Sequence, residues 1–318
     1  MTLNHTAPVI EIEKLSKVYQ KSRTETIYAL KDLDLSVHPG EIFGYLGPNG
    51  AGKTTTIRLL LDLIRPTHGR AAIFGQDVNQ HSVALHQRIG FLPGELNLWK
   101  NLTGRQVIQY VARVRGGVDE SYVRRLSERL QFDPTLRVRS YSSGNRRKLG
   151  LVLALMNQPE LLILDEPTNG LDPLMQQIFN EMMLEIRGEG RTVFLSSHIL
   201  SEVQSICDRV AILRNGELKA VETVTNLTHV DFRWVTVRLQ QPVQPNQLGS
   251  IPGVSDISQT EGGLRLRLVG DFDPLLRALG PYYVQDMRVQ EPTLEEVFLA
   301  FYGNHNAVHA GQVEGRVS

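Results

Sequence analysis

The fold is decided by the stretch Gly47-Pro48-Asn49-Gly50-Ala51-Gly52-Lys53-Thr54. It matches the pattern Gly-x-x-x-x-Gly-Lys-Ser/Thr and lies between a strand candidate, 41–46, and a segment of helical spacing, 53–65. Because glycine lacks a Cβ atom, such a loop can turn several backbone N–H groups toward a phosphate, beside the partial positive charge of a helix start. The stretch therefore predicts a strand, a phosphate-binding loop and a helix in succession.

The residue types in this loop predict an ATP site. In loops of this pattern the lysine pairs with the β- and γ-phosphates, and the Ser/Thr hydroxyl binds Mg²⁺. The alternative is a glycine-rich turn between strand and helix that binds nothing. We expect ATP and Mg²⁺ as cofactors, and ATP contacts from Gly47, Pro48, Asn49, Gly50, Ala51, Gly52, Lys53, Thr54 and Thr55.

A pair of carboxylates follows a second apolar run. Residues 161–164 are all aliphatic, and Asp165 and Glu166 come directly after them. Two adjacent negative charges at the end of a buried strand are costly without cations. We therefore expect Thr54 and Asp165 to hold Mg²⁺ and Glu166 to orient or deprotonate the attacking water, although Asp165 could instead serve as a helix cap.

His198 follows another strand candidate, 192–197, so it should reach the same sheet edge as Asp165. There it could hydrogen-bond the γ-phosphate. The alternative is a surface or capping histidine. With Lys53 and Glu166, His198 completes the expected catalytic set.

Apolar runs alternate with helical patterns from about residue 9 to residue 217, which predicts an α/β core with a largely parallel sheet. Strand signals disappear between about 94 and 157, where windows 103–115 and 119–131 predict an all-helical insert. Beyond Gly216, runs 232–239 and 264–269 alternate as half-exposed strands do. We expect a first domain over 1–220 with its helical subdomain at about 94–157, a small α+β domain over 221–303 that includes a helix at 293–302, and a disordered tail over 304–318.

Composition excludes several classes of protein. Lys and Arg total 34 and Asp and Glu total 34 in 318 residues, so no global charge favours nucleic acid or an anionic membrane. The single cysteine, Cys207, excludes an internal disulfide and fits a reducing compartment such as the cytosol. No signal-peptide core precedes Ser16, and the apolar run 149–156 is far below the roughly 20 residues of a membrane span. We expect a soluble chain whose membrane role comes from a partner.

A second potential phosphate contact is Tyr141-Ser142-Ser143-Gly144-Asn145, which precedes a helix expected over 146–157. Small residues and free amides at a helix start favour anion binding. The first loop already completes the cradle for one nucleotide. This segment therefore predicts contact with a second nucleotide, which a single molecule cannot make with its own ATP.

Over about residues 9–217 the chain resembles the nucleotide-binding subunit of an ATP-binding-cassette (ABC) transporter. The resemblance implies a P-loop core with a mostly parallel sheet, an N-terminal antiparallel β region and a helical insert. It also implies that Tyr19 stacks on adenine and that Ser142, Ser143, Gly144 and Asn145 form the signature that contacts the opposite subunit's ATP. Gly170, Leu171 and Asp172 are similar to the loop that crosses the dimer seam, and Asp165, Glu166 and His198 to the metal, catalytic and switch residues.

Two motifs depart from the family's usual form. The signature has Tyr141, Ser143 and Asn145 where Leu, Gly and Gln are usual, and Gly94 stands where the family usually has a glutamine. Gly94 has no side chain to hold Mg²⁺ or water, so we expect Glu95 or a water to substitute. The basic cluster 146–148 could bind phosphate or nucleic acid, but we expect a solvated helix face.

The resemblance also implies partners. Two subunits, expected to be identical, would face each other head to tail with ATP between Lys53 of one and Ser142 of the other. A separate permease would place them at the cytoplasmic face of the cell membrane. Residues 291–303 are similar to the C-terminal region of drug-exporter subunits, although a packing or dimerisation helix fits equally well. A nucleic-acid or ribosome factor, and an ATP binder without turnover, are the competing classes. The first lacks a second cassette here, and Glu166 and His198 oppose the second.

Overall fold

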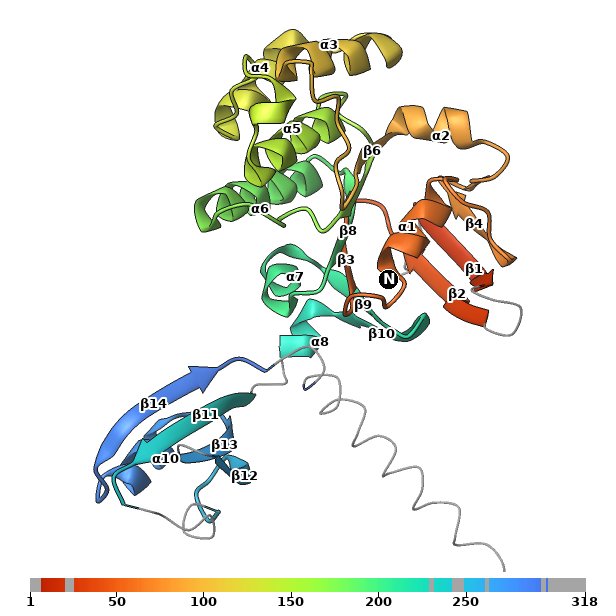
Figure 1. The fold of residues 1–318 in the computed structure, drawn as a ribbon. Helices are drawn as coiled ribbons and strands as arrows, with labels where there is room; N and C mark the ends of the chain where they lie inside the picture. The colour runs from red at the N-terminus through yellow and green to blue at the C-terminus, as the bar shows by residue number, and fades with distance from the viewer. Residues whose placement is uncertain are drawn as a thin grey trace, which may run out of the picture. The chain divides into compact units, whose positions relative to one another are not determined.

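Figure 1 shows the computed structural model, which describes residues 7–20, 26–228, 232–241, 249–260, 263–292 and 296. The chain divides into two compact units, Met1–Val224 and Thr225–Ser318. None of the described helices is long and apolar enough to cross a membrane.

The first unit is built on a six-stranded sheet with strand order β10-β9-β3-β8-β7-β6. Neighbours are parallel except β9 and β10, which are antiparallel. Every residue of β3, β7 and β8 is buried, as expected for parallel strands covered on both faces. The strands are β3 (Ile42–Leu46), β6 (Ile89–Leu92), β7 (Leu161–Asp165), β8 (Thr192–Ser197), β9 (Arg209–Arg214) and β10 (Glu217–Thr223).

A four-stranded antiparallel sheet, β2-β1-β4-β5, forms the second layer of this unit. Its strands are β1 (Ile10–Gln20), β2 (Thr26–Val37), β4 (His68–Ile73) and β5 (Gln76–Asp77). Apolar side chains of both sheets, among them Ile10 and Leu33 from one and Tyr45 and Phe194 from the other, share one buried core. The predicted α/β fold with an N-terminal antiparallel region is confirmed.

Helices flank the six-stranded sheet. α1 (Lys53–Leu60) ends five residues before the predicted 65, and α6 (Pro173–Gly188) begins after Asp172, whose side chain accepts from the Met175 amide as a cap. The other helices of this layer are α2 (Ser82–Arg88) and α7 (Leu200–Ile206), and α8 (Val224–Thr228) follows β10.

The chain between β6 and β7 is helical, as predicted. It contains α3 (Gly104–Val114), α4 (Glu120–Arg129), the 3-10 turn η1 (Val138–Ser140) and α5 (Ser143–Leu155). Thr103 and Gln106 form a capping box at the start of α3, and Asp119 caps α4. Figure 1 places these helices on the side of the six-stranded sheet away from β1 and β2. We call α3 to α5 the helical insert.

The second unit is a four-stranded antiparallel sheet, β12-β13-β11-β14, with α10 (Asp273–Leu279) packed on one face. The core residues alternate along the strands, for example Val235 and Val237, and meet Leu275 and Leu279 of the helix. The helix predicted at 293–302 lies outside the described residues apart from Glu296, as does the tail predicted at 304–318. The strands are β11 (Phe232–Leu239), β12 (Val254–Thr260), β13 (Gly263–Val269) and β14 (Val284–Gln290).

Candidate functional site

The glycine-rich loop joins β3 to α1, and its glycines have backbone angles or close approaches that a side chain would strain. Gly50 and Gly52 have φ of 81° and 112°. A Cβ atom on Gly52 would lie 2.6 Å from the Ala29 carbonyl oxygen, and one on Gly47 would lie 2.4 Å from that of Leu213. The loop is therefore held tightly against β2 and β9, with the start of α1 opening toward it.

Lys53 is buried inside the curl of this loop, with 6% of its surface exposed. Its Nζ donates to the carbonyl of Gly47 at 2.6 Å and to that of Pro48 at 3.3 Å. The same nitrogen lies 3.2 Å from Glu166 Oε1. A buried ammonium needs anionic partners. A phosphate chain that entered the loop would therefore be such a partner for Lys53.

Asp165 is buried at the end of β7, and both of its oxygens accept hydrogen bonds. Thr54 Oγ1 donates to Oδ2 at 2.9 Å, and Ser196 Oγ donates to Oδ1 at 2.5 Å. The two side chains predicted to hold Mg²⁺ are therefore in direct contact. The described part of the chain has no cluster of three His, Cys, Asp or Glu that could hold a metal. Two oxygen ligands fit Mg²⁺, which commonly takes one or two protein groups and completes its shell with phosphate and water.

Glu166 connects Lys53 to His198. Its Oε2 lies 2.7 Å from His198 Nδ1, and its backbone N–H donates to Ser196, with the carbonyl oxygen at 3.2 Å and Oγ at 3.1 Å. Its φ of 50° is left-handed, a conformation that costs about 1–3 kcal/mol for a residue with a side chain. The carboxylates of Asp165 and Glu166 thus reach different partners, one the Thr54 hydroxyl and the other the Lys53 and His198 nitrogens.

Lys53, Thr54, Asp165 and Glu166 line a hollow of about 360 Å³, which we call the Lys53 pocket. His198 does not line it and is linked to it through its contact with Glu166. The wall of the pocket includes Thr55, Gly94, Glu95 and Asn169 besides the carboxylate pair and residues 48–50 and 52–54 of the loop, whereas Gly47 and Ala51 do not line it. Ile27 and Tyr28 of β2 also line it, and sequence reasoning missed both, although Tyr28 is an aromatic residue 54% exposed in a strand.

The structure does not bring Tyr19 to the wall of this pocket. Tyr19 pairs with Ile27 across β1 and β2, and Lys17 Nζ lies 5.2 Å from the centre of its ring. Tyr19 is 41% exposed. The adenine contact expected of Tyr19 stays a prediction.

The signature residues lie elsewhere in the unit. Ser142 and Ser143 are exposed, and Ser142 Oγ accepts from the Asn145 amide at 3.2 Å as the cap of α5. None of residues 142–145 lines the Lys53 pocket. Gly144 instead lies against the predicted dimer-seam loop, because a Cβ atom on it would be 2.9 Å from the Gly170 carbonyl oxygen. The helix start therefore faces outward beside Gly170, Leu171 and Asp172.

The prediction of a solvated face over 146–148 is wrong for Arg147, which is 5% exposed. Helix α5 begins at Ser143, three residues earlier than expected, and the buried residues of its first turns include Arg147 and Leu151, four apart on one face. The guanidinium donates to backbone carbonyls of Pro93, Gly94 and Asn169. Burial lowers the pKa of Arg147, and the charges of Asp165 and Glu166 oppose that shift.

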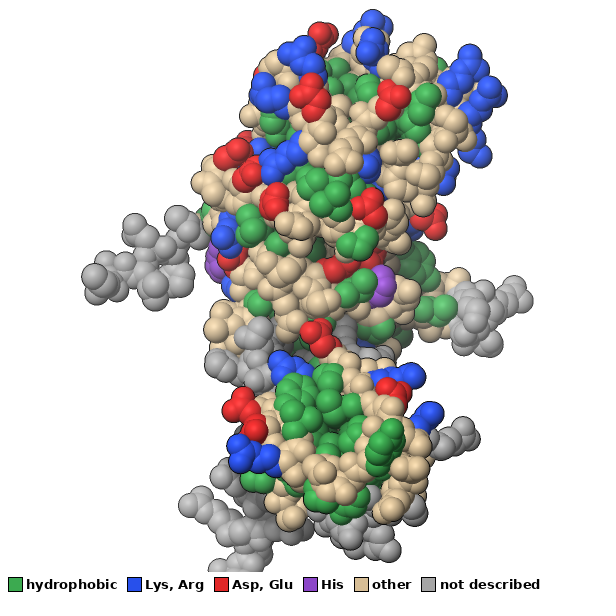
Figure 2. All heavy atoms as spheres, turned by 90° about the vertical axis from the view of Figure 1, so that its left-hand side faces the viewer, with side chains coloured by type: hydrophobic (Ala, Val, Ile, Leu, Met, Phe, Trp, Pro, Cys, Tyr) green, Lys and Arg blue, Asp and Glu red, His purple; other side chains and the backbone are tan. Residues whose placement is uncertain are grey.

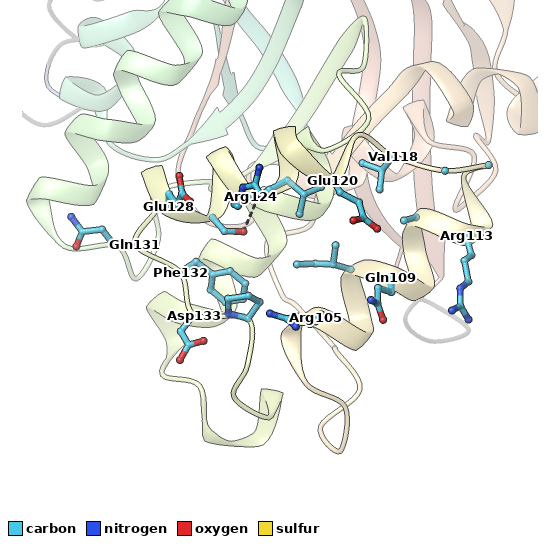
Figure 3. Close-up of a pocket in the computed structure, with 17 residues that line it drawn as sticks. Arg105, Gln109, Arg113, Val118, Glu120, Arg124, Glu128, Gln131, Phe132 and Asp133 are labelled. Carbon is cyan, nitrogen blue, oxygen red and sulfur yellow. Dashed lines mark hydrogen bonds between the residues drawn. The ribbon is translucent and has the colours of Figure 1, made fainter.

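A larger hollow, about 1160 Å³, lies in the helical insert between α3 and α4. Figure 3 shows Arg105 and Arg113 of α3 and Arg124 of α4 around it, together with Glu120 and Glu128. Figure 2 shows Lys and Arg side chains gathered at the outer end of this insert. The hollow contains neither a glycine-rich loop nor a carboxylate pair at a strand end, so the chemistry points to the Lys53 pocket.

Comparison with known proteins gives an independent view. The profile of the family described as "ABC transporter" matches residues 30–169. The ABC transporter ATP-binding protein YhcH of Bacillus subtilis is 33% identical over 91% of this chain and 95% of its own length. The bacitracin transport ATP-binding protein BcrA of Enterococcus faecalis is 36% identical over 69% of this chain and 70% of its own length. A dimeric, post-hydrolysis structure of the ATP-binding cassette MJ0796 bound to ADP and Pi shares the fold, with a TM-score of 0.63 at 22% identity over 68% of this chain and 98% of that chain.

Proposed function

Because this chain belongs to the ABC transporter family as an ATP-binding subunit and ATPase, we propose that it binds Mg²⁺-ATP in the Lys53 pocket and powers a separate permease. The convergence of Lys53, Glu166 and His198 with the Thr54 and Asp165 oxygens is the observation that supports this most. We assign residues 1–220 to the nucleotide-binding domain, with 94–157 as its helical subdomain, and 221–303 to an accessory α+β domain. The compact units of the structure divide a few residues later, after Val224, because β10 pairs with β9 as far as Thr223.

Each residue has a separate task in this proposal. Lys53 exchanges its contact with Glu166 for the β- and γ-phosphates, because the phosphate chain enters the curl of the loop. Glu166, released from Lys53, accepts a proton from the water that attacks the γ-phosphorus as the bond to the bridging oxygen breaks. His198 holds Glu166 and then the γ-phosphate. Thr54 and Asp165 would hold Mg²⁺, whose charge offsets the negative charge that develops on the phosphate oxygens.

The exposed signature requires a second subunit. Ser142 and the start of α5 do not line the pocket of their own chain, so we place them against the ATP of a partner copy, opposite its Lys53. A preorganised donor at a developing charge contributes about 2.7–4 kcal/mol, which a single copy would lack. ATP would close the pair and hydrolysis would open it, so that the helical insert and the loop near Gly94 move a permease.

We place the assembly at the cytoplasmic face of the cell membrane, bound there through the permease. Export of a drug-like, lipid or polymer substrate is the direction we propose. The similarity to a protein named for bacitracin transport supports a drug-like substrate. Nucleic acid is not an expected partner, since the formal net charge of the chain is zero.

The test is phosphate release from Mg²⁺-ATP by the full chain and by Glu166→Gln. We expect the parent to release phosphate and Glu166→Gln to be slower by about 10²–10⁴-fold while still binding ATP, because only the proton acceptor is lost. Co-purification with a polytopic membrane protein would support the transporter. Equal turnover in the two proteins, or stimulation by RNA, would contradict the proposal.

A further inference from the structure

Arg147 ties the ends of two strands of the main sheet to the helix that carries the signature. Its two terminal nitrogens donate to the successive carbonyls of Pro93 and Gly94, each at 2.8 Å, directly after β6. Its Nε donates to the carbonyl of Asn169 at 3.3 Å, in the turn after the carboxylate pair. The planar fork of a guanidinium suits several fixed acceptors at once, which the single nitrogen of a lysine cannot match.

The Arg147 guanidinium is buried and lies close to the reacting groups. Among the described residues, no carboxylate forms an ion pair with Arg147, so its charge is compensated at longer range by Asp165 and Glu166. Gly94 is next to that pair, because a Cβ atom on it would be 3.1 Å from Asp165 Oδ2. A displacement of the Gly94 backbone is therefore a displacement at the wall of the Lys53 pocket.

On its other side, Arg147 is rigidly linked to the signature. It lies in the first turns of α5, and Ser142 caps the same helix. Helix α5 also packs closely on β6, since a Cβ atom on Gly150 would be 2.6 Å from Leu92 Cδ1. The Arg147 guanidinium thus connects α5, whose start we place against the partner's nucleotide, to the loop after β6, which lines the pocket of this chain.

We propose that Arg147 is a positioning residue that links the nucleotide pocket to the helical insert. It makes this link through backbone carbonyls, because Gly94 has no side chain with which to make it. This inference rests on the proposed ATPase function. Arg147 touches no substrate; it fixes Gly94 and the turn of Asn169 relative to Ser142, so that the two halves of the site move together.

The test compares Arg147→Lys, Arg147→Gln and Arg147→Met with Lys148→Met, which removes a cation from the next position of the same helix. Lys148 Nζ makes one long contact, 3.4 Å to the Gln131 carbonyl. Phosphate release by the full chain across ATP concentrations gives kcat and KM. We expect kcat to fall about 10- to 100-fold in Arg147→Gln and Arg147→Met, less in Arg147→Lys, with KM changed less than about threefold.

Hydrogen exchange supplies a readout that turnover does not. We expect the amides of Asn169 and Leu171, which donate to the carbonyls of Glu166 and Thr168, to exchange at least about tenfold faster in Arg147→Gln, because their turn loses its anchor, and to be unchanged in Lys148→Met. Should Arg147→Met fail to fold, Arg147→Lys and Arg147→Gln carry the test. A parent that releases no phosphate would overturn the proposed function itself. An active parent with Arg147 variants of equal kcat, or variants in which KM rises and kcat stays constant, would overturn the role of Arg147 alone.

Discussion

Two segments of the first unit have the features of a phosphate-binding site, yet their surroundings differ. The loop 47–54 is enclosed: Lys53 is 6% exposed and has Gly47, Pro48 and Glu166 as partners. The signature 142–145 is open, with Ser142 and Ser143 exposed and the Ser142 hydroxyl used as a helix cap. The difference supports the proposal that one chain supplies an enclosed cradle to one ATP site and an outward-facing contact to a second site.

The largest expected effect lies on the enclosed side. Lys53→Ala removes the cation that pairs with Glu166 and is expected to counter the phosphate charge, so turnover should fall at least about 10²–10³-fold and ATP affinity should fall with it. Phosphate release and binding of a fluorescent ATP analogue measure the two effects. Lys219→Ala, at an exposed ion pair with Glu217, is the matched control. Unchanged affinity in Lys53→Ala would show that phosphates bind elsewhere.

On the open side the effect should depend on assembly. Ser142→Gly removes the hydroxyl but keeps a residue acceptable as a cap, so we expect turnover to fall about 10- to 100-fold. ATP binding measured on dilute, separate chains should stay at the parent value, since Ser142 does not line the Lys53 pocket. Weakened binding in dilute chains would place Ser142 in its own chain's site and remove the contrast between the segments.

The adenine end of the enclosed site has two candidates. Tyr19→Ala should weaken ATP binding about fivefold or more, because a base stacked on an aromatic ring contributes about 1–3 kcal/mol. Tyr28→Ala is the control, since Tyr28 lines the pocket but is not the residue that the family resemblance selects. Titration with ATP and with inorganic triphosphate separates loss of the base contact from loss of phosphate binding. The reverse order, with Tyr28→Ala the weaker binder, would move adenine to β2.

The smallest effect is expected at Gly94. Gly94→Gln adds a side chain whose Cβ would lie 3.1 Å from Asp165 Oδ2, so its neighbour must shift slightly while the backbone carbonyl bound by Arg147 remains. Turnover should stay within about tenfold of the parent. Initial rates of phosphate release at saturating ATP check this. A larger loss would show that the position requires glycine.

Much of the enclosed site could be predicted because its signals are local in the chain. The loop pattern, the aliphatic run ending in Asp165 and the strand before His198 each specify a strand end, and parallel strands bring their ends to one edge of a sheet. The α/β fold followed from the same alternation. The contact of Thr54 with Asp165, 111 positions apart, follows once the strands are neighbours.

What the sequence could not provide depended on the rotation of a helix or on single backbone angles. Three consecutive cations, 146–148, indicate a polar face, but the start of α5 at Ser143 decides which of them turns inward, and it is Arg147. No sequence pattern predicts the left-handed backbone of Glu166, because a residue with a side chain rarely adopts it. Tyr28 belongs to the pocket only because β2 passes beside the loop.

The contrast between enclosed and open segments is tested most directly by mixing two impaired proteins. Full-length Lys53→Ala lacks the cradle cation, and full-length Ser142→Gly lacks the signature hydroxyl. In a two-fold dimer, a mixed pair places both defects in one site and leaves the other intact, so equal amounts of the two should restore about a quarter of the parent's phosphate release. A rate equal to the average of the two separate variants would contradict the account.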